Sequence, residues 1–180
     1  MLLDVDAEAE AIRARAGLSR DDLPGSVDLA VALGVNVRRV DPRLLRGSDA
    51  CAIQLNGHPE IFVARKLADA TLHWVVSHEV AELHLASIGY REPDVEFVAD
   101  AIAAALVMPA PIYRAAIREH GHRLDALAAD FLVDQTAAAI RLAEVEAVDM
   151  AVVVTPSAST PARPTNGYCR PRARSDEEPW

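Results

Sequence analysis

The chain has 180 residues, of which 51% are hydrophobic, 25% are charged and only 4% are aromatic. This length suits one globular domain, and alanine, at roughly a fifth of the residues, favours a core built mainly from helices over a sheet-dominated fold. The formal net charge of −9 disfavours nucleic acid and anionic lipid as partners unless a local basic patch overrides it.

The cysteines and the N-terminus indicate the compartment. Cys51 and Cys169 are far apart in the sequence and fit neither a disulfide framework nor a paired-cysteine zinc site. The first residues are acidic, where a signal peptide needs a basic flank. No apolar run approaches the roughly 18 residues of a membrane span. We therefore expect a soluble, cytoplasmic protein with no membrane partner.

The first part of the chain predicts two helices followed by a small sheet. Helical composition covers residues 6–16 and 24–33, and a glycine follows each segment. Spaced valines predict a short strand over 35–40. Two apolar runs flank Asn56-Gly57, a pair typical of tight turns, and predict a hairpin over 51–64. We expect about three short strands in an antiparallel sheet.

The second part predicts helices and a tail. A long helix is predicted over 69–87, and a second over 93–107 that ends before Pro109. Shorter helices are predicted over about 112–120, 123–132 and 134–147. Prolines, serines and arginines then replace the aliphatic residues, so we expect residues 155–180 to be disordered. The expected organisation is one mainly helical α+β domain over 1–154, followed by this tail.

The helix over 69–87 carries the residues that point to chemistry. His78 and Glu82 lie one turn apart on a largely apolar stripe, so both are expected to face inward. A buried imidazole and a buried carboxylate need a partner, and a divalent metal ion satisfies both. Glu79 would stand beside that ion, where a general base acts on water. The next helix offers Glu96 as a third ligand and Asp100 as the acceptor for the other ring N–H of His78.

A purely structural reading of these residues stays open at the level of sequence. His78 would then be a core histidine that donates to Glu82, and Glu79 would be solvated. Glu96, with Asp94, would be a favourable first-turn charge near the positive end of a helix dipole. The spacing alone does not choose between the two readings.

Two sequence blocks resemble a known family. Residues 78–82 read HEVAE, and residues 96–109 read EFVADAIAAALVMP. They resemble the ImmA/IrrE family of bacterial zinc metallopeptidases, in which an HExxH helix precedes a helix with E-x-x-A-N/D that ends in Met-Pro. The similarity spans about residues 21–145 and includes a helix-turn-helix-like segment at about 123–147. The resemblance implies a zincin-like fold.

By position, the resemblance makes His78 the first metal ligand, Glu79 the general base and Glu96 the third ligand. The family's second histidine is Glu82 here, which we expect to ligate through oxygen. Two carboxylates and a neutral imidazole cancel the charge of a divalent ion, where two imidazoles and one carboxylate leave +1, so the ion would be a weaker Lewis acid. We expect one divalent metal, zinc, with manganese or iron as alternatives because oxygen ligands favour them.

The expected function is that of a metal-dependent peptidase in which Glu79 activates a water held by the metal. The family resemblance implies limited cleavage of a helix-turn-helix repressor, in a stress or mobile-element response. The alternative is a weakly active or inactive member that acts as a regulatory protein-binding module, which Glu82 favours. Direct DNA binding through 126–142 is disfavoured because this region is acidic, with Asp125, Asp130, Asp134 and Glu144.

Overall fold

The computed structural model of the chain describes residues 3–19 and 21–150, and the side chains of 148–150 are not described. The predicted tail lies outside these residues, so the domain boundary at 154 stays a prediction. The described elements are α1 (Val5–Arg15), α2 (Ser26–Ala32), β1 (Asn36–Val40), a 3₁₀ helix η1 (Pro42–Leu45), β2 (Ala50–Leu55), β3 (His58–Ala64), α3 (Asp69–Ser87), α4 (Val95–Val107), α5 (Ala110–His120), α6 (Leu124–Asp130) and α7 (Gln135–Met150).

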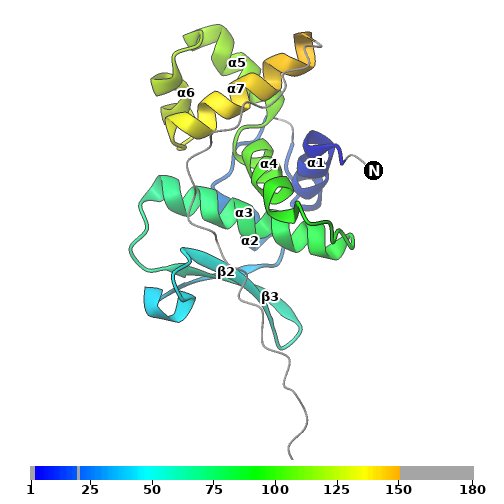
Figure 1. Cartoon of the computed structure of the whole chain (residues 1–180), viewed down its shortest axis with the longest axis vertical. Coiled ribbons are helices and arrows are strands. Elements are labelled where there is room, and N and C mark those ends of the chain that lie inside the picture. Colours follow the sequence, from blue (N-terminus) through cyan, green and yellow to red (C-terminus); the bar gives the residue numbers. More distant parts are fainter. Residues whose placement is uncertain (1–2, 20, 151–180) are drawn as a thin grey trace, which may run out of the picture.

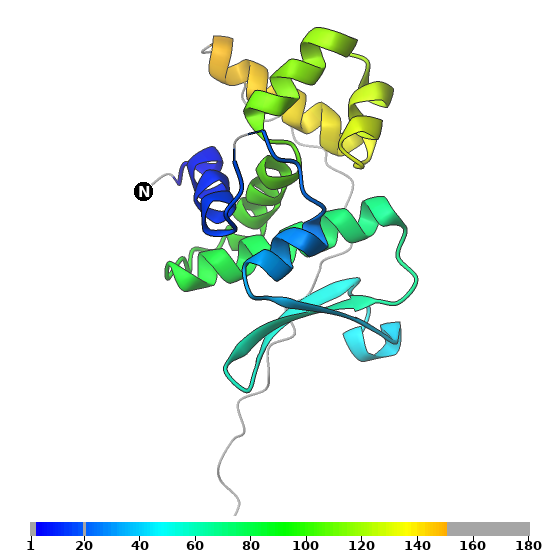
Figure 2. The ribbon, with the colours of Figure 1, turned by 180° about the vertical axis from the view of Figure 1, so that it is seen from behind.

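The elements stack in layers on α3. The sheet covers one side of α3, and α4 and α1 lie on its other side (Figure 1). The group α5–α7 forms the end of the molecule away from the sheet. Seen from behind, α2 lies along α3 and leads into β1 (Figure 2). The predicted mainly helical α+β fold is confirmed.

The three-stranded sheet is mixed, so the prediction of an antiparallel sheet is wrong in one pairing. The strand order is β1-β3-β2, with β2 and β3 antiparallel and β1 and β3 parallel. The hairpin turn at Asn56-Gly57 explains the first pairing, because both residues have positive φ, 53° and 82°, as a two-residue primed turn requires. The parallel pairing arises because the chain leaves β1 through η1 and returns as β2 on the far edge, which places β3 beside β1.

The helices agree with their predicted positions, with small shifts at the ends. Helix α3 covers 69–87 as predicted, whereas α4 begins two residues later than expected and α5 two residues earlier. Helix η1 was not predicted. It is capped by the side chain of Asp41, which accepts a hydrogen bond from the backbone N–H of Arg43 at 2.9 Å.

Helix α4 is the buried centre of the fold. Its alanines 99, 103, 104 and 105 are all buried, and small side chains allow neighbouring helices to approach closely. Helices α3 and α1 pack on it directly. Among the described residues no single helix is long and apolar enough to cross a membrane; only α4 and α5 taken together, across a 62° bend, reach that length and composition.

Arg141 connects the C-terminal helices to the rest of the domain. Its side chain is 2% exposed, although arginine is rarely buried. Its Nε donates to the carbonyl oxygen of Met108 at 3.0 Å, and its other nitrogens pair with Asp6 at 2.5 Å and Glu144 at 3.2 Å. One guanidinium thus joins α7, the end of α4 and α1.

We predict that Arg141→Met destabilises the protein by about 1–3 kcal/mol, because the buried carbonyl of Met108 loses its donor. The partners Asp6 and Glu144 are partly exposed, which keeps the cost below that of breaking a fully buried ion pair. Urea denaturation followed by circular dichroism measures the change. The control is Arg118→Met on the exposed side of α5, expected to change stability by less than about 0.5 kcal/mol. Equal stability of the two variants would contradict the proposed role of Arg141.

Candidate metal centre

His78 is held by α3 and oriented by α4. It lies in the middle of α3, where its residue is 4% exposed. Its Nδ1 is 3.0 Å from Oδ1 of Asp100, one turn beyond Glu96 on α4. A carboxylate at Nδ1 accepts the ring N–H there, so in the neutral ring the lone pair is on Nε2. The predicted contact between His78 and Asp100 is therefore present.

The other ring nitrogen of His78, Nε2, faces two carboxylates. It lies 3.3 Å from Oε1 of Glu82 and 3.6 Å from Oε2 of Glu96. Among the described residues Nε2 has no hydrogen bond of acceptable geometry, although it is buried. Two ligands at about 2.1 Å from a tetrahedral ion are separated by about 3.4 Å. These distances therefore suit three atoms that share one cation.

The three side chains form the group in the described residues that can hold a metal ion, with ligand atoms all within 4.8 Å of one another. The side chain of Glu82 is 12% exposed and that of Glu96 is 46% exposed, so the site is closed on the α3 side and open to solvent at α4. An open side is what a catalytic metal site needs for water or substrate. The orphaned Nε2 and the donor set fit a divalent ion.

Glu79 is buried beside this group and is not part of it. Burial, followed by the negative charge of Glu82, raises the pKa of Glu79 to about 8, and His78 opposes the shift. The backbone N–H of Ala52 on β2 also stabilises the carboxylate by a hydrogen bond. One of its oxygens has no hydrogen-bond partner in the described part of the chain. A carboxyl group with a pKa near neutrality is suited to accept and return a proton.

The electrostatics of the group demand a cation. Burial alone would lower the pKa of His78, but the hydrogen bond to Asp100 and the adjacent Glu82 outweigh it and raise the pKa to about 10. Burial and the charge of Glu82 also raise the pKa of Glu96. In the absence of a metal, protons bound to His78 and to the carboxyl groups reduce the negative charge of the group.

The family model of the IrrE N-terminal-like domain, Peptidase_M78, matches residues 30–143, more than half of the chain. The chain belongs to the ImmA/IrrE family. This is a metallopeptidase-type family, and the match includes α3 and α4 with all the residues of the candidate centre. A search of curated proteins finds no match. Within the ImmA/IrrE fold of this chain, α1 precedes the matched region and is joined to it by Arg141 and Asp6.

Four of the five other histidines are bound to partners away from this centre. His84 is buried and binds Oε2 of Glu8 at 2.6 Å, which fastens α1 to α3. His73 accepts a hydrogen bond from the backbone N–H of Ser26 at 3.2 Å. His120 pairs with Asp130, and His122 with Glu146, on the C-terminal helices. Each therefore has a structural partner away from His78.

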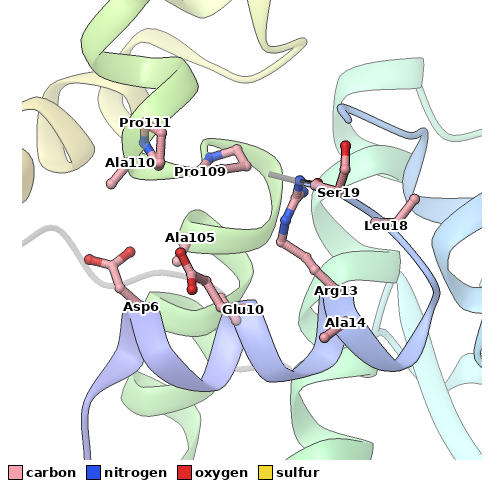
Figure 3. A pocket seen from close by; sticks show the side chains of 11 residues that line it. Asp6, Glu10, Arg13, Ala14, Leu18, Ser19, Ala105, Pro109, Ala110 and Pro111 are labelled. Carbon is pink, nitrogen blue, oxygen red and sulfur yellow. Dashed lines mark hydrogen bonds between the residues drawn. The ribbon is translucent and has the colours of Figure 1, made fainter. Parts of the chain in front are cut away.

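A separate hollow lies between α1 and the link from α4 to α5 (Figure 3). Asp6, Glu10 and Arg13 face Pro109 and Pro111 across it. The guanidinium of Arg13 is already bound to the carbonyl oxygens of residues 19 and 22, at 2.9 and 2.6 Å. Asp6 is bound to Arg141. This hollow contains none of the candidate metal ligands, and its charged groups serve the fold.

Sequence reasoning missed one participant, the N–H of Ala52. This donor belongs to the backbone, so no side chain marks it. The predicted hairpin placed Ala52 on a strand, but which strand edge faces α3 depends on tertiary packing.

We predict that Asp100→Asn weakens metal binding by about 10–100-fold. An amide presents either a donor or an acceptor to Nδ1 and carries no charge, so the orientation and basicity of His78 are no longer fixed. Titration with Zn²⁺ against a chromophoric competitor measures the change. Asp94→Asn, an exposed change just before the same helix, is the control and should bind as wild type. Equal metal affinities of the two variants would show that Asp100 does not contribute to metal binding.

We also predict that metal binding at pH 7 releases at least one proton. The pKa of His78 is raised, so its ring is protonated in the metal-free protein at pH 7 and must lose that proton before Nε2 can bind a metal. Affinity should therefore rise with pH up to about 10 and level off above it. Calorimetric titration in buffers of different ionisation enthalpy counts the protons. Release of none would show that the ring is already neutral.

Proposed function

We propose that the protein is a metal-dependent peptidase that cleaves a peptide bond in a regulatory protein. The observation that carries the proposal is the buried Nε2 of His78, which has no hydrogen bond in the described part of the chain and faces carboxylate oxygens of Glu82 and Glu96 at distances suited to a shared ion. The family supports the same reaction class.

The protein's residues have distinct roles in this proposal. His78, Glu82 and Glu96 would hold the ion, and Asp100 would position His78. When bound, a divalent ion polarises the substrate carbonyl and acidifies water. Glu79 would take a proton from the attacking water and pass it to the leaving amine, because its carboxylate is buried next to the ligands and has an unpaired oxygen. The N–H of Ala52 fixes the orientation of that carboxylate.

Glu82 supports a second candidate function. With Glu82 and Glu96 ionised and His78 neutral, the two negative charges of the ligands would cancel the charge of a divalent ion, so the metal centre as a whole would be neutral. Such an ion is a weaker Lewis acid than one held by two imidazoles, and oxygen ligands favour manganese or iron over zinc. A protein with this site would then act by binding a regulatory protein rather than by cutting it.

The proposed substrate is a protein, by family resemblance a helix-turn-helix repressor. Strand β2 supports access by an extended chain, because in the described part of the chain it is an edge strand of the sheet and its Ala52 contacts Glu79. The acidic residues Asp125, Asp130 and Asp134 in and around α6 and α7 disfavour direct DNA binding by these helices.

We expect the protein to bind about one divalent metal ion per chain. Elemental analysis after loading with Zn²⁺, Mn²⁺ or Fe²⁺ and removal of excess metal measures the stoichiometry. His78→Ala should lose the ion, because Nε2 is the central donor. His122→Ala, at an exposed histidine on the far end of the protein, is the matched control and should retain it. Absence of metal in the wild type, or its retention in His78→Ala, would refute the metal centre.

Peptidase activity requires its own test. Metal-loaded protein is incubated with a repressor encoded nearby, and cleavage is followed by mass spectrometry. Glu79→Gln should retain the metal and lose activity by about 10²–10⁴-fold, since the amide cannot accept the proton. Glu82→His distinguishes the two functions. Cleavage by the histidine variant, together with none by the metal-loaded wild type, would support the binding module and reject the peptidase.

A further inference from the structure

Positive charge is concentrated in one part of this acidic chain. Residues 38–66 hold six of the 18 lysines and arginines and only three of the 27 aspartates and glutamates. This segment therefore carries +3, which leaves −12 for the remaining residues. Such a separation of charge along one chain indicates a surface with its own partner.

The fold brings five of the six cations to one end of the sheet. Strands β1 and β3 are parallel and end together, since the N–H of Arg65 donates to the carbonyl of Val40 at 3.0 Å and the guanidinium of Arg39 donates to the carbonyl of Arg65 at 3.1 Å. Helix η1 follows β1 and packs against β3 at this end (Figure 1). We call the exposed side chains gathered here the basic patch: Arg39, Arg43, Arg46, Arg65 and Lys66.

The sixth cation, Arg38, is not counted in the patch because Glu60 neutralises it at 2.9 Å. Three acidic side chains, Asp41, Asp49 and Asp69, are exposed within three residues of a patch residue in the sequence. Asp41 is partly engaged as the cap of η1, where it accepts the N–H of Arg43. The positive charge of the patch is therefore larger than the negative charge of its acidic neighbours.

An exposed leucine lies among these cations. Leu44 in η1 is 69% exposed, whereas the adjacent Leu45 is 2% exposed and anchors the helix. Leu44 follows Arg43 directly and lies two residues before Arg46, and an exposed apolar side chain next to arginines is typical of a protein interface, with an apolar centre and a polar rim. A surface that only follows a phosphate backbone has no use for the leucine. The combination favours a protein partner over nucleic acid.

We propose that the basic patch docks an acidic segment of a partner protein that places an apolar side chain against Leu44. The opposite charge of such a segment complements the patch, and the rest of this chain repels it, which directs it to this end of the sheet.

The position of the patch connects docking to the candidate centre. The carbonyl of Asp49, in the loop that leaves η1, accepts the N–H of Ala64 at the end of β3. Strand β2 begins at the next residue, and Ala52, two residues further, donates to Glu79. A partner held on the patch is therefore held beside the candidate centre. Docking goes beyond the proposed peptidase activity, because none of the patch residues is a metal ligand and binding needs no metal.

The test uses the full chain and short fluorescent peptides in anisotropy titrations. The probe is a glutamate-rich peptide with a central leucine, and its control has glutamine in place of every glutamate. We expect the acidic probe to bind, to bind more weakly as salt is raised, and to outcompete the glutamine peptide. The double variant Arg43→Glu/Lys66→Glu should lose at least about 10-fold in affinity. Leu44→Ser should lose about 3-fold with the same probe.

The matched control is Arg118→Glu, a charge reversal at an exposed arginine of α5, which should bind the probe as wild type does. A labelled DNA duplex serves as the competing ligand. The proposal is overturned if the acidic probe does not bind, if Arg118→Glu weakens it as much as the double variant, or if DNA binds more tightly through Arg43 and Lys66. Metal content is measured on the same samples, so a failed docking surface is distinguished from a failed metal centre.

Discussion

The need to neutralise buried carboxylates around one histidine governs the candidate centre. Glu79, Glu82, Glu96 and Asp100 all act on His78 or on one another, and each partly buried negative charge is costly unless a cation offsets it. The raised pKa values of His78 and Glu79 express this demand as bound protons. A single divalent ion would neutralise the same carboxylates. Metal binding and the local stability of the two helices therefore depend on the same charges.

The alanines of α4 make this arrangement geometrically possible. Glu96 and Asp100 reach His78 because α4 packs closely on α3, and bulky residues at positions 99 or 103, on the same side of α4 as Glu96, would separate the two helices. The low aromatic and high alanine content of the chain thus has a local consequence. A tightly packed pair of helices positions ligands more accurately than loops do.

The parts of the structure that follow from local periodicity were predictable. The inward direction of His78 and Glu82, the limits of α3 and the turn at Asn56-Gly57 depend on neighbouring residues, and all agree with the structure. The parallel pairing of β1 and the pairing of Arg141 with Asp6 depend on residues far apart in the sequence. No periodicity marks such contacts. The roles of the ligands and of Glu79 remain predictions.

Glu82 affects catalysis more than it affects the fold. A histidine and a glutamate at this position both face Nε2 of His78 from one turn away, and both can contribute one ligand atom. They differ in charge, and the charge acts on Glu79 as well as on the metal. The negative charge of Glu82 raises the pKa of Glu79 and makes it a stronger base. The same charge lowers the acidity that a metal confers on water. The stronger base therefore offsets part of the rate that the weaker Lewis acid loses. A glutamate at this position is thus compatible with a slow peptidase.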